Sequence, residues 1–180
     1  MIALRLVRLI EHHSDALAGE LVVKLETSSR TADLRKVPIE ELRQRLLTGR
    51  GATPELVETV IERLCEYGYL DDARFAQSYA SLRVQQRPIG RQRLQRDLWQ
   101  KKIDKQTVDA ALDQVFEQMP EDDLIDRAIA KRVRLRGRPN TREEAKKLFD
   151  HLLRQGFAFE LVSDKVRALL QSESEDDAGQ

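Results

Sequence analysis

The sequence has a single cysteine, Cys65, and few aromatic residues, which make up 5% of its 180 residues. One cysteine cannot form a disulfide within the chain, which fits a reducing compartment. No long apolar run is present, because Arg5, Arg8 and Glu11 interrupt the apolar N-terminal stretch. We therefore expect a cytoplasmic protein with neither a signal peptide nor a membrane-spanning helix.

Catalytic and metal-binding motifs are also missing. The sequence contains no phosphate-binding glycine loop, no Cys-x-x-Cys and no His-Glu-x-x-His. His12 and His13 are adjacent, so their side chains would diverge on a helix, and His151 has no obvious partner. The pairs Asp71-Asp72 and Asp122-Asp123 stand where helices are expected to begin, which favours capping over metal binding. We expect no enzymatic activity, no metal and no cofactor.

Apolar residues at helical spacing run through most of the chain. The sequence is 41% hydrophobic and 34% charged, which is enough apolar content to fold but describes a thin, highly solvated protein. No segment shows the alternation of apolar and polar residues that is typical of strands. The pattern predicts an all-α fold.

Glycine, proline and capping residues mark the predicted helix ends. Gly68 is predicted to end one helix at a sharp corner, after which Asp71 or Asp72 caps the next. That next helix is predicted to carry the apolar residues Phe75, Ala76, Tyr79 and Leu82. Further helix starts are predicted at Thr53-Pro54, at Asp122 or Asp123 and at Thr141, where Glu144 completes a capping box.

An internal repeat becomes visible when these helices are aligned. Apolar residues recur at intervals of about 50 residues, as expected for a repeat protein. The matched sets are Leu42, Leu46, Val57 and Ile61; Leu94, Leu98, Val108 and Leu112; and Leu148, Leu152, Val162 and Val166. Each unit is predicted to have three helices, and stacked units of this kind predict an elongated, curved array of tandem three-helix repeats.

The repeat divides the chain into five predicted segments. Residues 1–37 hold one or two N-terminal helices and a polar linker, the lead part of the first repeat. Residues 38–70 complete the first repeat, 71–119 form the second and 120–170 form the third. Residues 171–180 are acidic and without large apolar side chains, so they are predicted to form a disordered tail.

Charge alternates in blocks although the chain has 31 basic and 31 acidic residues. Arg83–Lys105 holds eight basic residues and two acids, and Arg127–Arg138 holds six basic residues and no acid. A basic stripe of this kind suits phosphates or an acidic protein groove, although charged faces also solubilise thin helices. Trp99, beside the stripe, is either an interface anchor or a packing residue. The candidate partner-binding face is Arg83, Arg87, Arg91, Arg93, Arg96, Lys101, Lys102, Arg132, Arg134, Arg136 and Arg138.

The corner after Gly68 resembles a known signature. The run Gly68-Tyr69-Leu70-Asp71-Asp72, followed by Arg74 and Phe75, is similar to the central signature of the RecX family of RecA regulatory proteins. The resemblance extends from about Ile39 to about Leu170, and most of these signature residues are expected to be structural. One departure is the turn before Ile103, which has Lys101-Lys102 where the family usually has a glycine.

The resemblance implies a regulator of homologous recombination, DNA repair and the SOS response. Such a protein would bind RecA-type recombinase filaments on DNA, reducing their ATPase, strand-exchange and co-protease activities. A weak DNA contact, no membrane contact and a monomeric state are expected. Two other functions stay open on the residues alone: a helical DNA-binding protein that acts directly on nucleic acid, and a generic helical adaptor for a protein partner.

Overall fold

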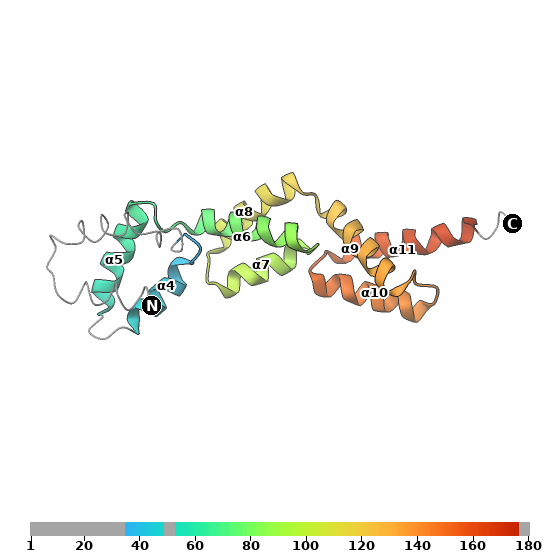
Figure 1. Ribbon diagram of the computed structural model, residues 1–180, viewed down its shortest axis with the longest axis horizontal. Helices are drawn as coiled ribbons and strands as arrows, with labels where there is room; N and C mark the ends of the chain where they lie inside the picture. The colour runs from blue at the N-terminus through green and yellow to red at the C-terminus, as the bar shows by residue number, and fades with distance from the viewer. Residues whose placement is uncertain (1–34, 49–52, 177–180) are drawn as a thin grey trace. The chain divides into compact units, whose positions relative to one another are not determined.

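The computed structural model describes residues 35–48 and 53–176, and these form eight helices and no strand (Figure 1). The helices are α4 (Ile39–Leu47), α5 (Pro54–Glu66), α6 (Asp72–Gln86), α7 (Arg91–Gln100), α8 (Lys105–Gln118), α9 (Glu121–Arg136), α10 (Arg142–Gln155) and α11 (Phe159–Asp176). The prediction of an all-α fold is confirmed. The helices and linker predicted within 1–34, and the turn at Gly49 and Gly51, lie outside the described residues.

The chain divides into two compact units. The first comprises residues 1–76 and 99–107, and the second comprises 77–98 and 108–180. In the first unit, α4 and α5 pack around a core of Leu42, Leu46, Val57, Ile61, Leu64, Tyr69 and Leu70. The corner after α5 takes the predicted form, because Gly68 has φ 69 and both Tyr69 N and Leu70 N donate to the carbonyl of Leu64.

The second unit is built from α8, α9, α10, α11 and the buried sides of α6 and α7. Every apolar residue of the second and third repeat sets is buried, from Leu94 at 0% exposure to Val166 at 6%. Of the apolar residues that the predicted helix carries, Leu82 is 54% exposed. The buried stripe of α6 instead follows Ala76, Ala80 and Val84, because residues four apart share a face of a helix.

Helix α7 begins directly on the end of α10. Gly90 N donates to Gln155 O at 3.0 Å, and Gln92 N donates to Gly156 O at 3.1 Å. Free amides at a helix start and free carbonyls at a helix end need partners, and here each supplies the other. The approach is close enough that a Cβ on Gly90 would lie 2.3 Å from the backbone of Gly156.

Two carboxylates cap a helix of the preceding repeat. In the first unit, Asp72 at the start of α6 accepts a hydrogen bond from Ile39 N at the start of α4, at 3.0 Å. In the second unit, Glu121 at the start of α9 accepts one from Arg91 N at the start of α7, at 2.9 Å. Burial raises the pKa of both carboxyl groups above the ordinary value. The same contact therefore recurs at equivalent helix starts.

The predicted local caps are correct at three helix starts and wrong at one. The acceptors are Asp71 Oδ1 for Arg74 N, Thr53 Oγ1 for Leu56 N and Thr141 Oγ1 for Glu144 N. Neither Asp122 nor Asp123 caps α9: the N-cap is Pro120, whose carbonyl accepts from Leu124 N at 3.3 Å. The helix starts earlier than predicted because a proline fits just before the first turn.

The acidic C-terminal segment is helical for longer than predicted. The sequence prediction placed a disordered tail from residue 171, but α11 continues to Asp176. The segment after Leu170 contains no proline, and its first glycine is Gly179, so no residue stops the helix at 171. The predicted disorder of 177–180 lies outside the described residues.

Lys102 stands where the third repeat has a glycine. Its φ is 61, in the left-handed region, and Lys102 N donates to Trp99 O at 2.8 Å. The equivalent residue after α10 is Gly156, with φ 90. The left-handed conformation crowds the Cβ of any residue other than glycine, so the departure from the family pattern places backbone strain at this turn.

Replacing Gly90 by alanine tests the close contact between α7 and α10. We expect Gly90→Ala to lower the free energy of unfolding by about 1 to 3 kcal/mol, because the added methyl group meets backbone atoms that cannot rotate away. The control is Gln92→Ala, at an exposed position two residues along, with an expected change within about 0.5 kcal/mol. Urea unfolding followed by circular dichroism measures both. Equal midpoints for the two variants would contradict the close contact.

Replacing Lys102 by glycine should stabilise the protein. Removing the strain gains roughly 1 to 2 kcal/mol, and the greater freedom of glycine in the unfolded chain offsets about half of it. The exposed ion pair with Glu40, at 3.4 Å, adds little to stability. Urea unfolding should therefore give a gain of up to about 1 kcal/mol for Lys102→Gly and a loss for Lys101→Gly, whose backbone needs no positive φ. A loss in both variants would show that the strain is absent.

Candidate functional site

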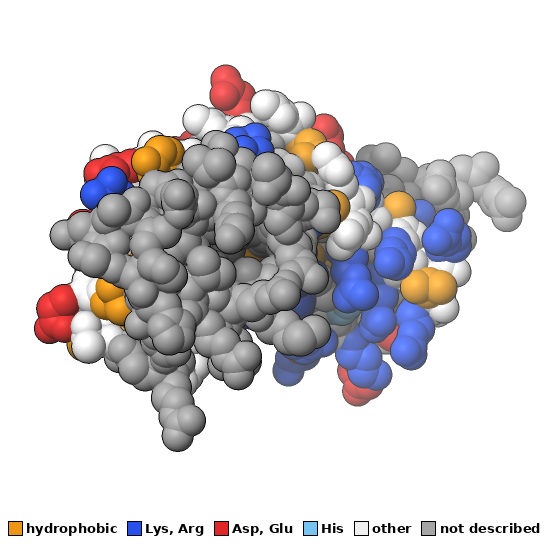
Figure 2. Space-filling view, turned by 60° about the vertical axis from the view of Figure 1, so that its left-hand side comes forward, with side chains coloured by type: hydrophobic (Ala, Val, Ile, Leu, Met, Phe, Trp, Pro, Cys, Tyr) orange, Lys and Arg blue, Asp and Glu red, His pale blue; other side chains and the backbone are white. Residues whose placement is uncertain are grey.

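The second unit carries a hollow whose wall is strongly basic. Its volume is about 440 Å³, and we call it the basic hollow. Its lining residues are Arg83, Arg87, Pro88, Ile89, Arg93, Ala128, Lys131, Arg132, Leu135, His151 and Gln155. They come from the end of α6, the loop before α7, and helices α7, α9 and α10, and none of them is an acid. Figure 2 shows Lys and Arg side chains gathered on this part of the surface.

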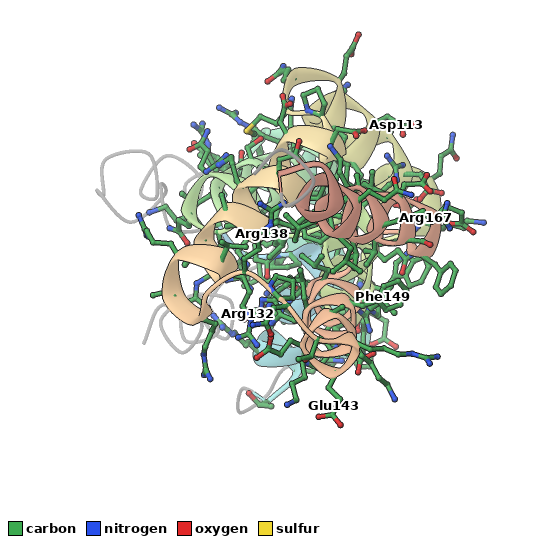
Figure 3. All side chains as sticks on the ribbon, turned by 90° about the vertical axis from the view of Figure 1, so that its right-hand side faces the viewer. Asp113, Arg132, Arg138, Glu143, Phe149 and Arg167 are labelled. Carbon is green, nitrogen blue, oxygen red and sulfur yellow. The ribbon has the colours of Figure 1, made fainter. Side chains whose placement is uncertain are left out.

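A smaller hollow of about 200 Å³ lies beside it on α9 and α10. Arg132 lines both hollows, and Arg136 and Arg138 line the smaller one, together with Glu144 and Lys147. Arg138 Nη2 also donates to Leu169 O at 2.8 Å. Figure 3 shows Arg132 and Arg138 on one side of α10 and α11, whereas Phe149 and Arg167 lie on the other. The hollow-lining arginines Arg132 and Arg138 therefore lie on the same side of these helices.

Three contacts hold two of the four arginines of the hollow in place. Arg83 pairs with Asp97 at 3.6 Å and lies over the ring of Tyr79, 5.7 Å from its centre. Arg93 Nη1 donates to Gln155 Oε1 at 3.1 Å, which links α7 to α10. Fixed guanidinium groups lose less entropy when they bind an anion than mobile side chains do.

The surroundings of His151 favour its neutral form. It lies half-buried on α10, and burial is the main cause that lowers its pKa below the ordinary value. The positive charges of Arg132 and Arg154 lower the pKa further. The histidine thus adds a neutral, hydrogen-bonding ring to a wall that is otherwise cationic.

The structure divides the predicted partner-binding face. Arg83, Arg87, Arg93 and Arg132 line the basic hollow, and Arg136 and Arg138 line its smaller neighbour. Arg134 is exposed on α9 but lines neither hollow. The remaining predicted residues, Arg91, Arg96, Lys101 and Lys102, have other contacts.

Three of these side chains pair with another helix, and Arg96 bonds within its own helix. Arg91 pairs with Asp113 on α8 at 2.7 Å and lies over the Phe116 ring. Arg96 Nε donates to the carbonyl of Gln92 at 3.3 Å, within α7. In the first unit, Lys101 lies 3.8 Å from Glu41, and Lys102 lies 3.4 Å from Glu40. Ion pairs of this kind join α4 to the turn after α7.

The signature residues have mainly structural positions. Gly68, Tyr69 and Leu70 form the corner, and Asp71 and Asp72 cap two helix starts. Phe75 is 7% exposed, with Lys101 Nζ 5.6 Å from its ring centre, and Arg74 is exposed on α6. Trp99, whose role the sequence left open, is 44% exposed.

Sequence reasoning missed several residues of the basic hollow. Lys131 belongs to the basic run that the charge pattern revealed, but it was not placed on the face. Gln155, Leu135 and His151 are not Lys or Arg, so a search for runs of basic residues does not find them. The repeat offered one signal for His151, because it aligns with Asp97 of the second repeat when Leu98 is aligned with Leu152.

Comparison with known proteins identifies the family. A family model described as the second three-helix domain of RecX matches residues 71–112, which begin where the second repeat was predicted to begin. A regulatory protein RecX from Halorhodospira halophila is 36% identical over 165 residues, which cover 91% of this chain and 96% of that protein. The chain belongs to the RecX family. A RecX from Thermobifida fusca is 32% identical over 130 residues, 71% of this chain and 68% of that one.

Solved structures of RecX proteins have the same fold. The crystal structure of RecX from Lactobacillus salivarius matches with a TM-score of 0.67 at 16% identity, over 86% of this chain and 94% of that one. A second RecX crystal structure matches with a TM-score of 0.65 at 19% identity, over 82% of this chain and 68% of that one. The all-α repeat fold is therefore that of RecX proteins.

The described part of the chain holds no membrane-spanning helix and no metal-binding cluster. None of its helices is long and apolar enough to cross a bilayer. In the same residues, no group of three or more histidine, cysteine or carboxylate side chains is placed to hold a metal ion.

The lowered pKa of His151 predicts how stability depends on pH. The unfolded chain takes up a proton near the ordinary pKa of 6.5, whereas the folded chain resists protonation until the pH is lower. The stability that the neutral His151 contributes to the folded state is fully present above the unfolded-state pKa. It is lost as the pH falls from there toward the folded-state pKa. We expect wild type to lose more stability than His151→Asn when urea midpoints at pH 7.5 and 5.5 are compared. Equal losses would contradict the shift, and comparing the two proteins cancels the other titrating groups.

Proposed function

We propose that this RecX-family chain binds RecA-type recombinase filaments on DNA and reduces their ATPase, strand-exchange and co-protease activities. The observation that carries the proposal is its likeness to a regulatory RecX across 91% of the chain. It acts by binding rather than by catalysis, as a monomer in the cytoplasm. The basic side chains of the second unit contact the filament or its DNA.

The physical basis is the combination of repeats with a localised basic face. A filament presents the same surface on every subunit, so a chain of repeats contacts several copies at once, and weak contacts add through effective concentration. The net charge of zero means that attraction to the filament comes from the arrangement of charge rather than its total. Guanidinium groups bind phosphates and carboxylates equally well through paired hydrogen bonds.

Inhibition of the recombinase ATPase on single-stranded DNA tests the proposal. We expect inhibition well below one regulator per recombinase subunit, because one bound molecule affects several neighbours. The variant Arg87→Glu, Lys131→Glu should need at least about tenfold more protein for the same inhibition, since two exposed cations of the basic hollow become anions. The matched control Arg63→Glu, Arg167→Glu changes the net charge equally at exposed sites outside both hollows.

The outcomes separate the competing functions. Wild-type potency in the hollow variant, with folding confirmed by circular dichroism, would remove the basic face from the proposal. No inhibition by wild type up to equimolar protein, with strongly salt-dependent binding to naked DNA, would favour the DNA-binding alternative. No inhibition and no DNA binding would favour an adaptor for another protein.

A further inference from the structure

Helices α6 and α7 of the second repeat correspond to α9 and α10 of the third. Aligning the two pairs shows one difference in charge between the repeats. The buried residues Ala76 and Ala80 match Ile125 and Ile129, and Leu94 and Leu98 match Leu148 and Leu152. The same alignment places Arg83 opposite Arg132 and Asp97 opposite His151. The second repeat therefore has an arginine beside an acid where the third repeat has an arginine beside a histidine.

The difference leaves Arg132 without the carboxylate that its counterpart has. Arg83 lies 3.6 Å from Asp97, so it has an ion-pair partner within its own repeat. Arg132 lies near His151, which carries no negative charge and is itself disfavoured as a cation by Arg132. Three of these four residues line the basic hollow: Arg83, Arg132 and His151.

We propose that the basic hollow binds a phosphate group of a nucleotide or nucleic acid, the anion taking the place beside Arg132 that Asp97 takes beside Arg83. This inference goes beyond the proposed function, because it requires no recombinase. Arg87, Arg93 and Lys131 supply the remaining donors from the rim. Arginine forks match phosphate oxygens in pairs, and no carboxylate in the wall repels the ligand.

The size and the apolar part of the wall fit more than a bare ion. The volume of about 440 Å³ is within the usual range for small-molecule sites. Ile89, Ala128 and Leu135 line the hollow beside the cations, and Leu135 is 66% exposed. A base or sugar covers this apolar surface while its phosphate contacts the arginines. The hollow thus suits a nucleotide unit, either free or within a strand.

Phosphate binding is coupled to protonation of His151. Arg132 on α9 and Arg154 on its own helix are the cations that lower the pKa of His151. Further cations line the same hollow, from α6, its following loop, α7 and α9: Arg83, Arg87, Arg93 and Lys131. These cations oppose a proton on the ring, and a bound anion offsets them and accepts a hydrogen bond from the protonated ring. Binding therefore takes up a proton and strengthens as the pH falls.

The test measures binding of three phosphate compounds to the full chain. Fluorescence anisotropy follows a labelled oligothymidylate, and calorimetry follows a nucleoside triphosphate and inorganic pyrophosphate. Two variants act on His151 alone: His151→Asp restores the acid found in the second repeat, and His151→Asn removes the titrating group. Arg87→Glu, at an exposed loop position, is a further variant that places an anion in the hollow.

We expect His151→Asp to remain folded and to weaken phosphate binding at least about tenfold, because the introduced carboxylate would fill the place of the ligand. His151→Asn should bind at pH 7.5 as wild type does. Wild type should gain affinity for the oligonucleotide between pH 7.5 and 6.0, by at most about tenfold per pH unit for one proton, and neither His151 variant should. A phosphodiester keeps its charge in this range, so the gain belongs to the protein.

Binding of the oligonucleotide alone identifies a strand as the source of the phosphate, and competition by the triphosphate identifies a free nucleotide. Failure of all three compounds to bind, or unchanged binding by both His151→Asp and Arg87→Glu, overturns the inference. Recombinase inhibition by a His151→Asp variant that no longer binds phosphate would leave the proposed function standing without this site. The two proposals therefore fail separately.

Discussion

The head-to-tail contact between the end of α10 and the start of α7 is the constraint on which the second unit depends. Two hydrogen bonds cross it, from Gly90 N to Gln155 O and from Gln92 N to Gly156 O. They pair groups that would otherwise be left open at two helix ends. The contact needs glycine at both Gly90 and Gly156. A Cβ on Gly90 would lie 2.3 Å from the backbone of Gly156, and a Cβ on Gly156 would lie 2.4 Å from Arg93. Backbone atoms, rather than side chains that can adjust, thus fix where the third repeat meets the second.

Buried acid caps add a second restraint of the same kind. Asp72 and Glu121 each close the first turn of a helix in the preceding repeat, and burial raises the pKa of both carboxyl groups. The raised pKa means that desolvation disfavours the charged carboxylate. Each hydrogen bond therefore offsets part of the free-energy cost of burying that charge. A contact of this type specifies position more than it adds stability. The start of one repeat is thereby tied to the middle of the repeat before it.

The sequence predicted helix ends and buried positions correctly where a residue type determines the structure of its own helix turn. Gly68, Thr53 and Thr141 mark their helix ends, and the recurring leucines and valines identify buried positions, because those signals act within one or two turns. The sequence did not predict contacts between helices that are distant along the chain. Neither the pairing of Arg91 with Asp113 nor the closeness of Gly90 to Gly156 follows from spacing along the chain. The basic stripe was therefore predicted as one face, although several of its members bind neighbouring helices.

Repetition also explains how a binding site can arise without a change of fold. Arg83 and Asp97 show that the junction tolerates an ion pair, and the third repeat keeps the arginine while exchanging the acid for His151. Asp97 and His151, which occupy the same position in the two repeats, are both only partly buried. The difference between them therefore leaves the packing of Leu148 and Leu152 intact. It changes the charge beside the arginine, and the proposed phosphate would supply the anion that Asp97 supplies in the second repeat. A single substitution in a copied unit is therefore sufficient to turn an internal contact into an external one.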